Sequence, residues 1–240
     1  MADTVVIERR FRGPPASANG GYTCGVLADA LESDVVEVNL RLPPPVDRTL
    51  SLETDGAEAR LLDGEQMVAE AIALERLDRD VPDPPQLGEA EEAGRLYPYF
   101  EEHTFPECFV CGPDRSEGDG LRIYPGPLDG RTILACTWTP AAEFADAEGY
   151  ATTPIVWAAL DCPSGLAAHH FEGGDAPLAV LARLRGRLVA PIDVARPHVI
   201  VSWSLGREGR KHSAATAIFD AGVLRAFAEA LWIAPRSAAG

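Results

Sequence analysis

Residues 152–165, TTPIVWAALDCPSG, form a long apolar run with a single acidic residue, Asp161. Pro154 suits the first turn of a helix, where its missing N–H costs nothing, and the residues after it leave almost no polar face. The run is therefore predicted to be a buried helix that Pro163 and Gly165 end or kink. Because an unpaired buried charge is costly, Asp161 is expected to have a chemical role. The alternative is that it caps a neighbouring turn or lies at a solvated helix end.

The composition is that of an ordinary soluble globular protein. The chain has 240 residues, 46% hydrophobic and 24% charged, enough for one large core or two small ones. Its formal net charge of −16 argues against direct binding of nucleic acid and of anionic membranes. No run approaches the roughly 18 apolar residues of a membrane span. Residues 1–4 offer neither a basic n-region nor an apolar core segment, so no secretory signal is expected. A cytoplasmic location is therefore expected.

Five cysteines, an odd number in a chain without a secretory signal, indicate reduced thiols. Cys108 and Cys111 form a Cys-x-x-Cys pair. With no second pair, a structural zinc would have to recruit His103 and a more distant ligand, so no metal or other cofactor is expected. A redox role is no better supported, because no strand precedes the pair and no helix opens after it.

Strands and turns are predicted for most of the remaining chain. A first helix is expected from Asn19 to about Ser33, because apolar residues recur there at helical spacing. The segment from Gln66 to Leu77 could be strand or helix by propensity alone. Residues 78–105 are rich in acidic residues and prolines and are predicted to be a connector.

The second half of the chain repeats the order of the first. Three short matches recur in sequence order: Arg41-Leu42 with Arg187-Leu188, Pro45-Val46-Asp47 with Pro191-Ile192-Asp193, and Ala69-Glu70-Ala71 with Ala228-Glu229-Ala230. This order predicts two copies of one fold, residues 1–77 and 106–235. By comparison with its counterpart, the doubtful segment 66–77 is then a strand. One helix followed by antiparallel strands, given twice, indicates an α+β protein in which a sheet wraps a helix.

The chain resembles the tandem hotdog proteins of the acyl-CoA thioesterase superfamily. Asn19-Gly20-Gly21-Tyr22 is similar to the His-Gly-Gly opening of that family's helix, and CFVCG at 108–112 with GLRI at 120–123 is similar to a segment of phenylacetate-type thioesterases. Asp161 lies nine residues after Thr152, the family's spacing for its helix carboxylate. The resemblance implies two tandem hotdog repeats, each a long central helix wrapped by an antiparallel sheet, and hydrolysis of an acyl-CoA thioester.

The resemblance also implies a catalytic site built from both helices. The amides of Gly20 and Gly21 would polarise the thioester carbonyl, since a helix start offers unpaired N–H groups and partial positive charge. Asp161 of the partner helix would act as a base or nucleophile. Asn19 and Tyr22 are expected to contact the substrate.

Two further features of the resemblance concern the second helix. Ser164 lies one residue from the position where family members often carry a hydroxyl that orients water. The mirror-related position has Thr153-Pro154 in place of the glycines and Ala28 in place of the acid. One composite site per chain is therefore expected.

An arginine cluster is the candidate site for an anionic ligand such as CoA. Arg183, Arg185 and Arg187 alternate along a predicted strand, which would put three guanidinium groups on one face. A solvated face is the alternative interpretation of this pattern.

Other functions stay open at this stage. A non-catalytic acyl- or CoA-binding or scaffolding protein is the alternative from another class. A hotdog dehydratase would need a histidine after Gly118-Asp119-Gly120, and none follows there. His169-His170 is predicted to lie in a loop. Because the sheets of two such proteins commonly pair, a homodimer is also expected.

Overall fold

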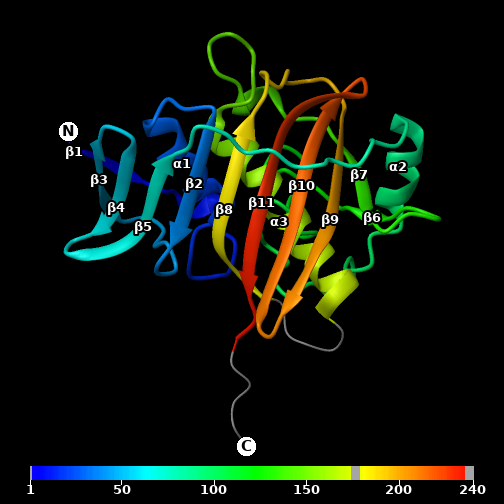
Figure 1. Cartoon of the computed structure of the whole chain (residues 1–240), viewed down its shortest axis with the longest axis horizontal. Coiled ribbons are helices and arrows are strands. Elements are labelled where there is room, and N and C mark those ends of the chain that lie inside the picture. The colour runs from blue at the N-terminus through cyan, green and yellow to red at the C-terminus, as the bar shows by residue number, and fades with distance from the viewer. Residues whose placement is uncertain (1, 174–178, 236–240) are drawn as a thin grey trace, which may run out of the picture.

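The computed structural model describes residues 2–173 and 179–235. In this part of the chain, eleven strands form one antiparallel sheet in the order β1-β3-β4-β5-β2-β8-β11-β10-β9-β7-β6 (Figure 1). The first half contributes β1 (Ala2–Val6), β2 (Val35–Leu40), β3 (Thr49–Asp55), β4 (Glu58–Asp63) and β5 (Gln66–Ala73). The second half contributes β6 (Gly126–Pro127), β7 (Leu134–Trp138), β8 (Val180–Leu188), β9 (His198–Glu208), β10 (Lys211–Asp220) and β11 (Val223–Ile233).

The two halves have the same strand order. Counted outward from the centre, the first half runs β2-β5-β4-β3-β1 and the second runs β8-β11-β10-β9-β7. The strands β2 and β8, each the first after a helix, pair antiparallel at the centre, with Val36 opposite Gly186. The predicted strand at 66–77 is confirmed as β5, which ends at Ala73. The α+β class predicted from the sequence is confirmed.

Two helices, α1 (Gly20–Ala30) and α3 (Thr153–Ala168), lie together on one face of this sheet (Figure 1). Asn19 caps α1, because its side-chain oxygen accepts a hydrogen bond of 2.8 Å from the Tyr22 N–H. The helices approach closely where α1 has glycine. A Cβ on Gly25 would lie 2.5 Å from the Pro154 Cα. Short 3₁₀ turns also occur at Arg9–Phe11 and Ala142–Phe144.

The central helix does not end at Pro163 or Gly165, which was one of the two outcomes predicted there. The helix α3 continues to Ala168 and passes into a π-helical turn, His169–Gly173, so the two histidines do not lie in a loop. A proline inside a helix removes one backbone hydrogen bond, but the surrounding turns are buried, and their packing outweighs that loss. Gly165 fits because the Trp232 ring occupies the space where its Cβ would be, 2.7 Å away.

The segment 78–105 crosses the opposite, outer face of the sheet (Figure 1). Near its start, Leu77 and Val81 pack against apolar side chains of that face, including Phe227. It then forms a helix, α2 (Leu87–Arg95), whose Ala90 and Ala93 are buried. The predicted connector therefore also contributes to a second apolar core.

We expect alanine at Gly25 to destabilise the protein and alanine at Gly88 to stabilise it slightly. The new methyl group at position 25 would push α1 away from α3, and overpacking of this kind costs about 1–3 kcal/mol. Gly88 in α2 has no atom within 4 Å of a built Cβ, so only the gain in helix propensity, up to about 1 kcal/mol, applies there. Urea unfolding followed by circular dichroism measures both. Equal stability of the two variants would contradict the close crossing.

Candidate active site

Asp161 lies within α3 and faces the start of α1. Its carboxylate Oδ2 accepts hydrogen bonds from the Gly21 N–H at 2.8 Å and from Asn19 Nδ2 at 2.9 Å. The side chain is only 2% exposed. The structure therefore brings together the acid and the helix start that the sequence singled out, although they are about 140 residues apart.

Glycine is required at position 21 for this contact. A Cβ there would lie 2.3 Å from the Asp161 Cβ and 2.6 Å from the Trp157 carbonyl oxygen. Gly20 instead borders a cavity, beside the side chains of Leu40 and Leu181. The two glycine amides thus have different positions. The Gly21 amide binds the carboxylate, whereas Gly20 borders the cavity.

The environment of Asp161 makes it a candidate for proton transfer. Burial raises its pKa to about 7, and this effect exceeds the lowering by the hydrogen bonds from Gly21 and Asn19. Its second oxygen, Oδ1, is buried and has no hydrogen-bond partner among the described residues. One carboxylate oxygen is therefore held in place, and the other has lone pairs that could accept a proton. The pKa of the group suits general-base chemistry at neutral pH.

A cavity of about 640 Å³ adjoins Asp161. Asn19 and Gly20 border it at the start of α1, and Asp161 borders it from α3. Much of its lining is apolar and includes Leu40, Phe105, Leu166, Leu181 and Trp232. Such a site suits a ligand that has one polar reacting group and an apolar portion.

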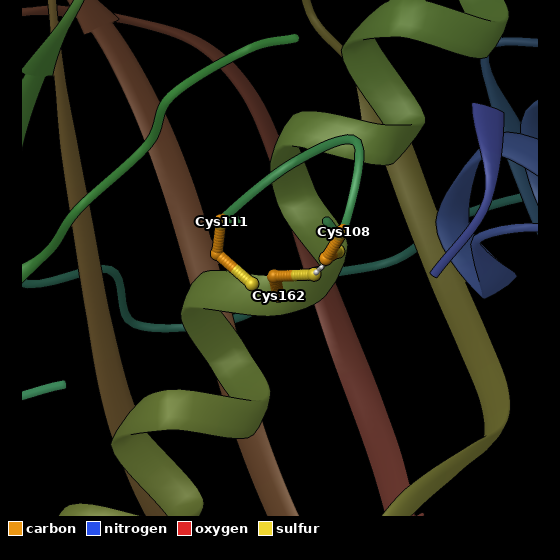
Figure 2. Close-up of side chains that lie close together, drawn as sticks. All are labelled: Cys108, Cys111 and Cys162. Atoms are coloured by element: carbon orange, nitrogen blue, oxygen red, sulfur yellow. Dashed lines mark hydrogen bonds between the residues drawn. The ribbon is translucent and has the colours of Figure 1, made fainter. Parts of the chain in front are cut away.

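Three cysteines meet beside Asp161 (Figure 2). The Sγ atoms of Cys108 and Cys162 are 3.7 Å apart, and those of Cys108, Cys111 and Cys162 all lie within 4.8 Å of one another. Hydrogen bonds from the other two thiols hold the pKa of Cys108 well below its usual range. Sequence reasoning missed Cys162, which is 54 residues from Cys108, because only the fold places α3 against the Cys-x-x-Cys segment.

His103 also lines the cavity, but it is oriented by the backbone. Its Nδ1 accepts a hydrogen bond of 3.0 Å from the Phe105 N–H, and its Nε2 is buried without a partner among the described residues. Burial lowers the pKa of this histidine. The ring is therefore neutral at physiological pH, with its proton on Nε2.

Two residues predicted for the site, Ser164 and Tyr22, contact other parts of the protein instead of the cavity. Ser164 is fully buried, donates to the Asp161 carbonyl oxygen at 2.7 Å and accepts from the Trp232 indole N–H at 2.9 Å. Its single proton is directed to the helix backbone, not to the carboxylate. The Tyr22 ring stacks on Phe11 with the centroids 4.1 Å apart, and it does not border the cavity.

The predicted arginine cluster lies on the outer face of the sheet. Arg183, Arg185 and Arg187 do share one face of β8, as the alternation predicted, but Gly186 on the other face is the residue that meets Trp157 of α3. Arg185 forms an ion pair with Glu37, and the Arg187 Nη1 atom lies 3.4 Å from the Asp78 Oδ1 atom. The structure thus does not bring these arginines to the cavity.

The mirror-related position lacks both the acid and the glycine amides. Pro154 lies against Gly25 in the helix crossing, and Ala28 is 3% exposed. No carboxylate stands at position 28 and no glycine amide at position 154. Of the two mirror-related positions, only one therefore pairs a carboxylate with glycine amides at a helix start.

Comparisons with known proteins agree with this architecture. No family model matches the sequence, and no curated protein matches it. A tesB protein of Mycobacterium avium subsp. paratuberculosis superposes with a TM-score of 0.67 at 12% identity, covering 98% of this chain and 93% of that one. A protein of unknown function with a hot dog fold from Alicyclobacillus acidocaldarius superposes with a TM-score of 0.59 at 11% identity, covering 98% and 94%. The chain has the hotdog fold.

A third similar structure comes from Thermobifida fusca and is described as a putative thioesterase II. It superposes with a TM-score of 0.65 at 15% identity, covering 98% of this chain and 94% of the other. At these identities the likeness establishes the fold. Within the described residues, no helix has both the length and the hydropathy needed to cross a bilayer.

The raised pKa of Asp161 predicts a pH dependence of stability. From its ordinary value of 3.8 up to about 7, the folded protein keeps a proton that the unfolded chain has lost. This contribution to stability is complete below about pH 4 and is lost as pH rises to about 7. The variant Asp161→Asn lacks this titrating group. As pH rises through that window, the free energy of unfolding of wild type should therefore fall relative to that of the variant, by up to about 1.4 kcal/mol per pH unit. Urea unfolding at several pH values, with a chelator and a reductant present, measures the difference. Parallel pH profiles would contradict the prediction.

Proposed function

We propose that this hotdog protein hydrolyses an acyl-CoA or related thioester at Asp161. The observation that carries the proposal is the state of the carboxylate. Its Oδ2 is fixed by the start of α1, and its Oδ1 has no hydrogen-bond partner within the described part of the chain. The carboxylate borders a largely apolar cavity. The description of the Thermobifida fusca protein as a putative thioesterase II supports the same reaction class.

In the proposed reaction, Asp161 Oδ1 takes a proton from a water molecule as that water attacks the thioester carbonyl carbon. The tetrahedral intermediate then collapses and the C–S bond breaks. The departing sulfur takes the proton from Asp161, which leaves a carboxylic acid and a thiol. Asn19 and Gly21 are positioning residues, because they hold the carboxylate.

We assign stabilisation of the developing oxyanion to the Gly20 N–H and the N-terminal end of α1. The first N–H groups of a helix have no partner inside the helix, and partial positive charge gathers there. Those of Gly21 and Tyr22 already donate to Asp161 and Asn19. Gly20 borders the cavity and is the first residue of the helix.

The alternative is a non-catalytic protein that binds an acyl or CoA group in the same cavity. The engagement of the Gly21 amide by Asp161 favours this alternative, because it removes one donor from the substrate carbonyl. Both proposals use one cavity, and only hydrolysis requires the free oxygen of Asp161.

We further infer two hotdog repeats, 1–77 and 106–235, connected by 78–105. The shared strand order of the two halves supports this division. A cytoplasmic location and a homodimer are additional proposals from the sequence.

Replacing the acid should separate enzyme from binding protein. We expect Asp161→Asn to lower kcat/KM for acyl-CoA thioesters by about 100-fold or more, because it removes the proton acceptor. Asp29→Asn is the matched control, since Asp29 is exposed on α1. Release of free thiol from short, medium and aromatic acyl-CoA thioesters measures the rates. Turnover at the wild-type rate in Asp161→Asn would refute the role of Asp161, whereas binding without turnover in wild type would favour the alternative.

Filling the cavity should change the preference for acyl chains. Leu166, 4% exposed, lies about one turn beyond Asp161 on α3 and borders the cavity. Leu166→Trp should raise KM for the longest accepted acyl chain by about 10-fold or more, with a smaller effect on the shortest, because space for several methylenes is lost. Leu87→Trp, at a 44% exposed position on α2, is the control. An equal change for all chain lengths would place the acyl group elsewhere.

A further inference from the structure

The three cysteines beside the cavity form a cluster that the proposed hydrolysis does not use. Cys108 and Cys111 come from the segment before β6, and Cys162 comes from α3 (Figure 2). We propose that Cys108, Cys111 and Cys162 bind a soft divalent cation of the Zn²⁺ class through three thiolates. The fourth coordination position is left to a ligand from the cavity that all three residues line.

The sulfur positions fit a tetrahedral metal better than they fit a disulfide. With Zn–S bonds of about 2.3 Å, two thiolates at a tetrahedral centre lie about 3.8 Å apart. The Cys108 and Cys162 sulfurs are 3.7 Å apart, and all three pairs lie within 4.8 Å. A disulfide would require an approach to about 2.05 Å and would leave one of the three thiols unused. A metal uses all three.

The segment that carries Cys108 and Cys111 is already shaped into a tight turn. The Gly112 N–H donates to the Cys108 carbonyl oxygen at 2.9 Å. A Cβ on Gly112 would lie 2.5 Å from the Cys108 nitrogen and from the Pro106 oxygen, so the turn requires glycine. This turn fixes two of the sulfurs next to each other before any ion binds, which lowers the ordering cost of binding.

Outer contacts also fit a thiolate site. Asn19 Nδ2 lies 3.6 Å from the Cys162 Sγ and can donate to it, as partners of metal ligands commonly do. Soft thiolate ligands select Zn²⁺ and similar ions over Mg²⁺ or Ca²⁺.

His103 does not supply the fourth ligand in this arrangement. Its Nδ1 accepts the Phe105 N–H, so the neutral ring carries its proton on Nε2 and has no lone pair there. Three protein ligands and one open position are typical of zinc sites that accept water or a substrate.

Cobalt binding tests the site without any substrate. The full-length reduced protein is titrated with Co²⁺, and the absorption of tetrahedral cobalt and of sulfur-to-cobalt charge transfer is recorded. We expect saturation at one Co²⁺ per chain and displacement of the cobalt by Zn²⁺. Cys162→Ser should weaken binding by more than the roughly 10- to 100-fold typical of losing an outer partner. Cys136→Ser is the control, because that buried thiol packs against Gly94 of α2 and should leave binding unchanged.

Two further measurements keep the proposal falsifiable if a variant folds poorly. In wild type, the intensity of the charge-transfer band reports the number of thiolates, and Zn²⁺ should raise the melting temperature in a concentration-dependent way. The proposal is overturned by the absence of a thiolate band, by a band unchanged in Cys162→Ser, or by a Cys108–Cys162 disulfide in place of metal binding. Because none of these readouts involves hydrolysis, they stand or fall separately from the role of Asp161.

Discussion

The close crossing of α1 and α3 is the constraint on which the site depends. Gly21 and Gly25 let the two helix backbones meet, and the crossing removes Asp161 from water. A buried carboxylate is costly, and two donors from the start of α1 offset part of that cost. What remains is a raised pKa and one oxygen that has no partner among the described residues, the properties that the proposed base needs. The burial that costs stability therefore also supports the chemistry proposed for this one side chain.

The two halves of the sheet share a strand order, but their helices differ. The start of α1 offers amides to an acid, whereas the start of α3 carries Pro154, which has no N–H. That proline fills the space beside Gly25 and so contributes to the crossing. Of the two helix starts, only that of α1 therefore places glycine amides beside an acid. The part of α3 that carries Asp161 also presents Cys162 to the Cys-x-x-Cys segment.

The local features of this site could be predicted from the sequence. Asn19 as a cap, Pro154 in a first helical turn and the alternation along β8 are short-range signals that do not depend on distant contacts. The apolar surroundings of Asp161 predicted a buried acid for the same reason. The repeated order of short matches predicted two copies of an α+β unit, because each half presents the same pattern of helix, strands and turns. The resemblance of the sequence motifs to tandem hotdog proteins predicted the hotdog fold.

Only the tertiary structure decided how these pieces are used. The alternation of Arg183, Arg185 and Arg187 predicted a shared face but not which face, and the sheet turns it away from the cavity. The helix α3 continues past Pro163, where local propensity would end it, because the burial of the surrounding turns outweighs one missing hydrogen bond. Cys162 joins the other two thiols, and the Gly21 amide meets Asp161, through contacts between segments 54 to 140 residues apart. The sequence therefore determined the two central helices and the order of the strands around them, but not α2 or the last turns of α3. The packing of α3 determined the site, since side-chain contacts across such separations exist only once the helices cross.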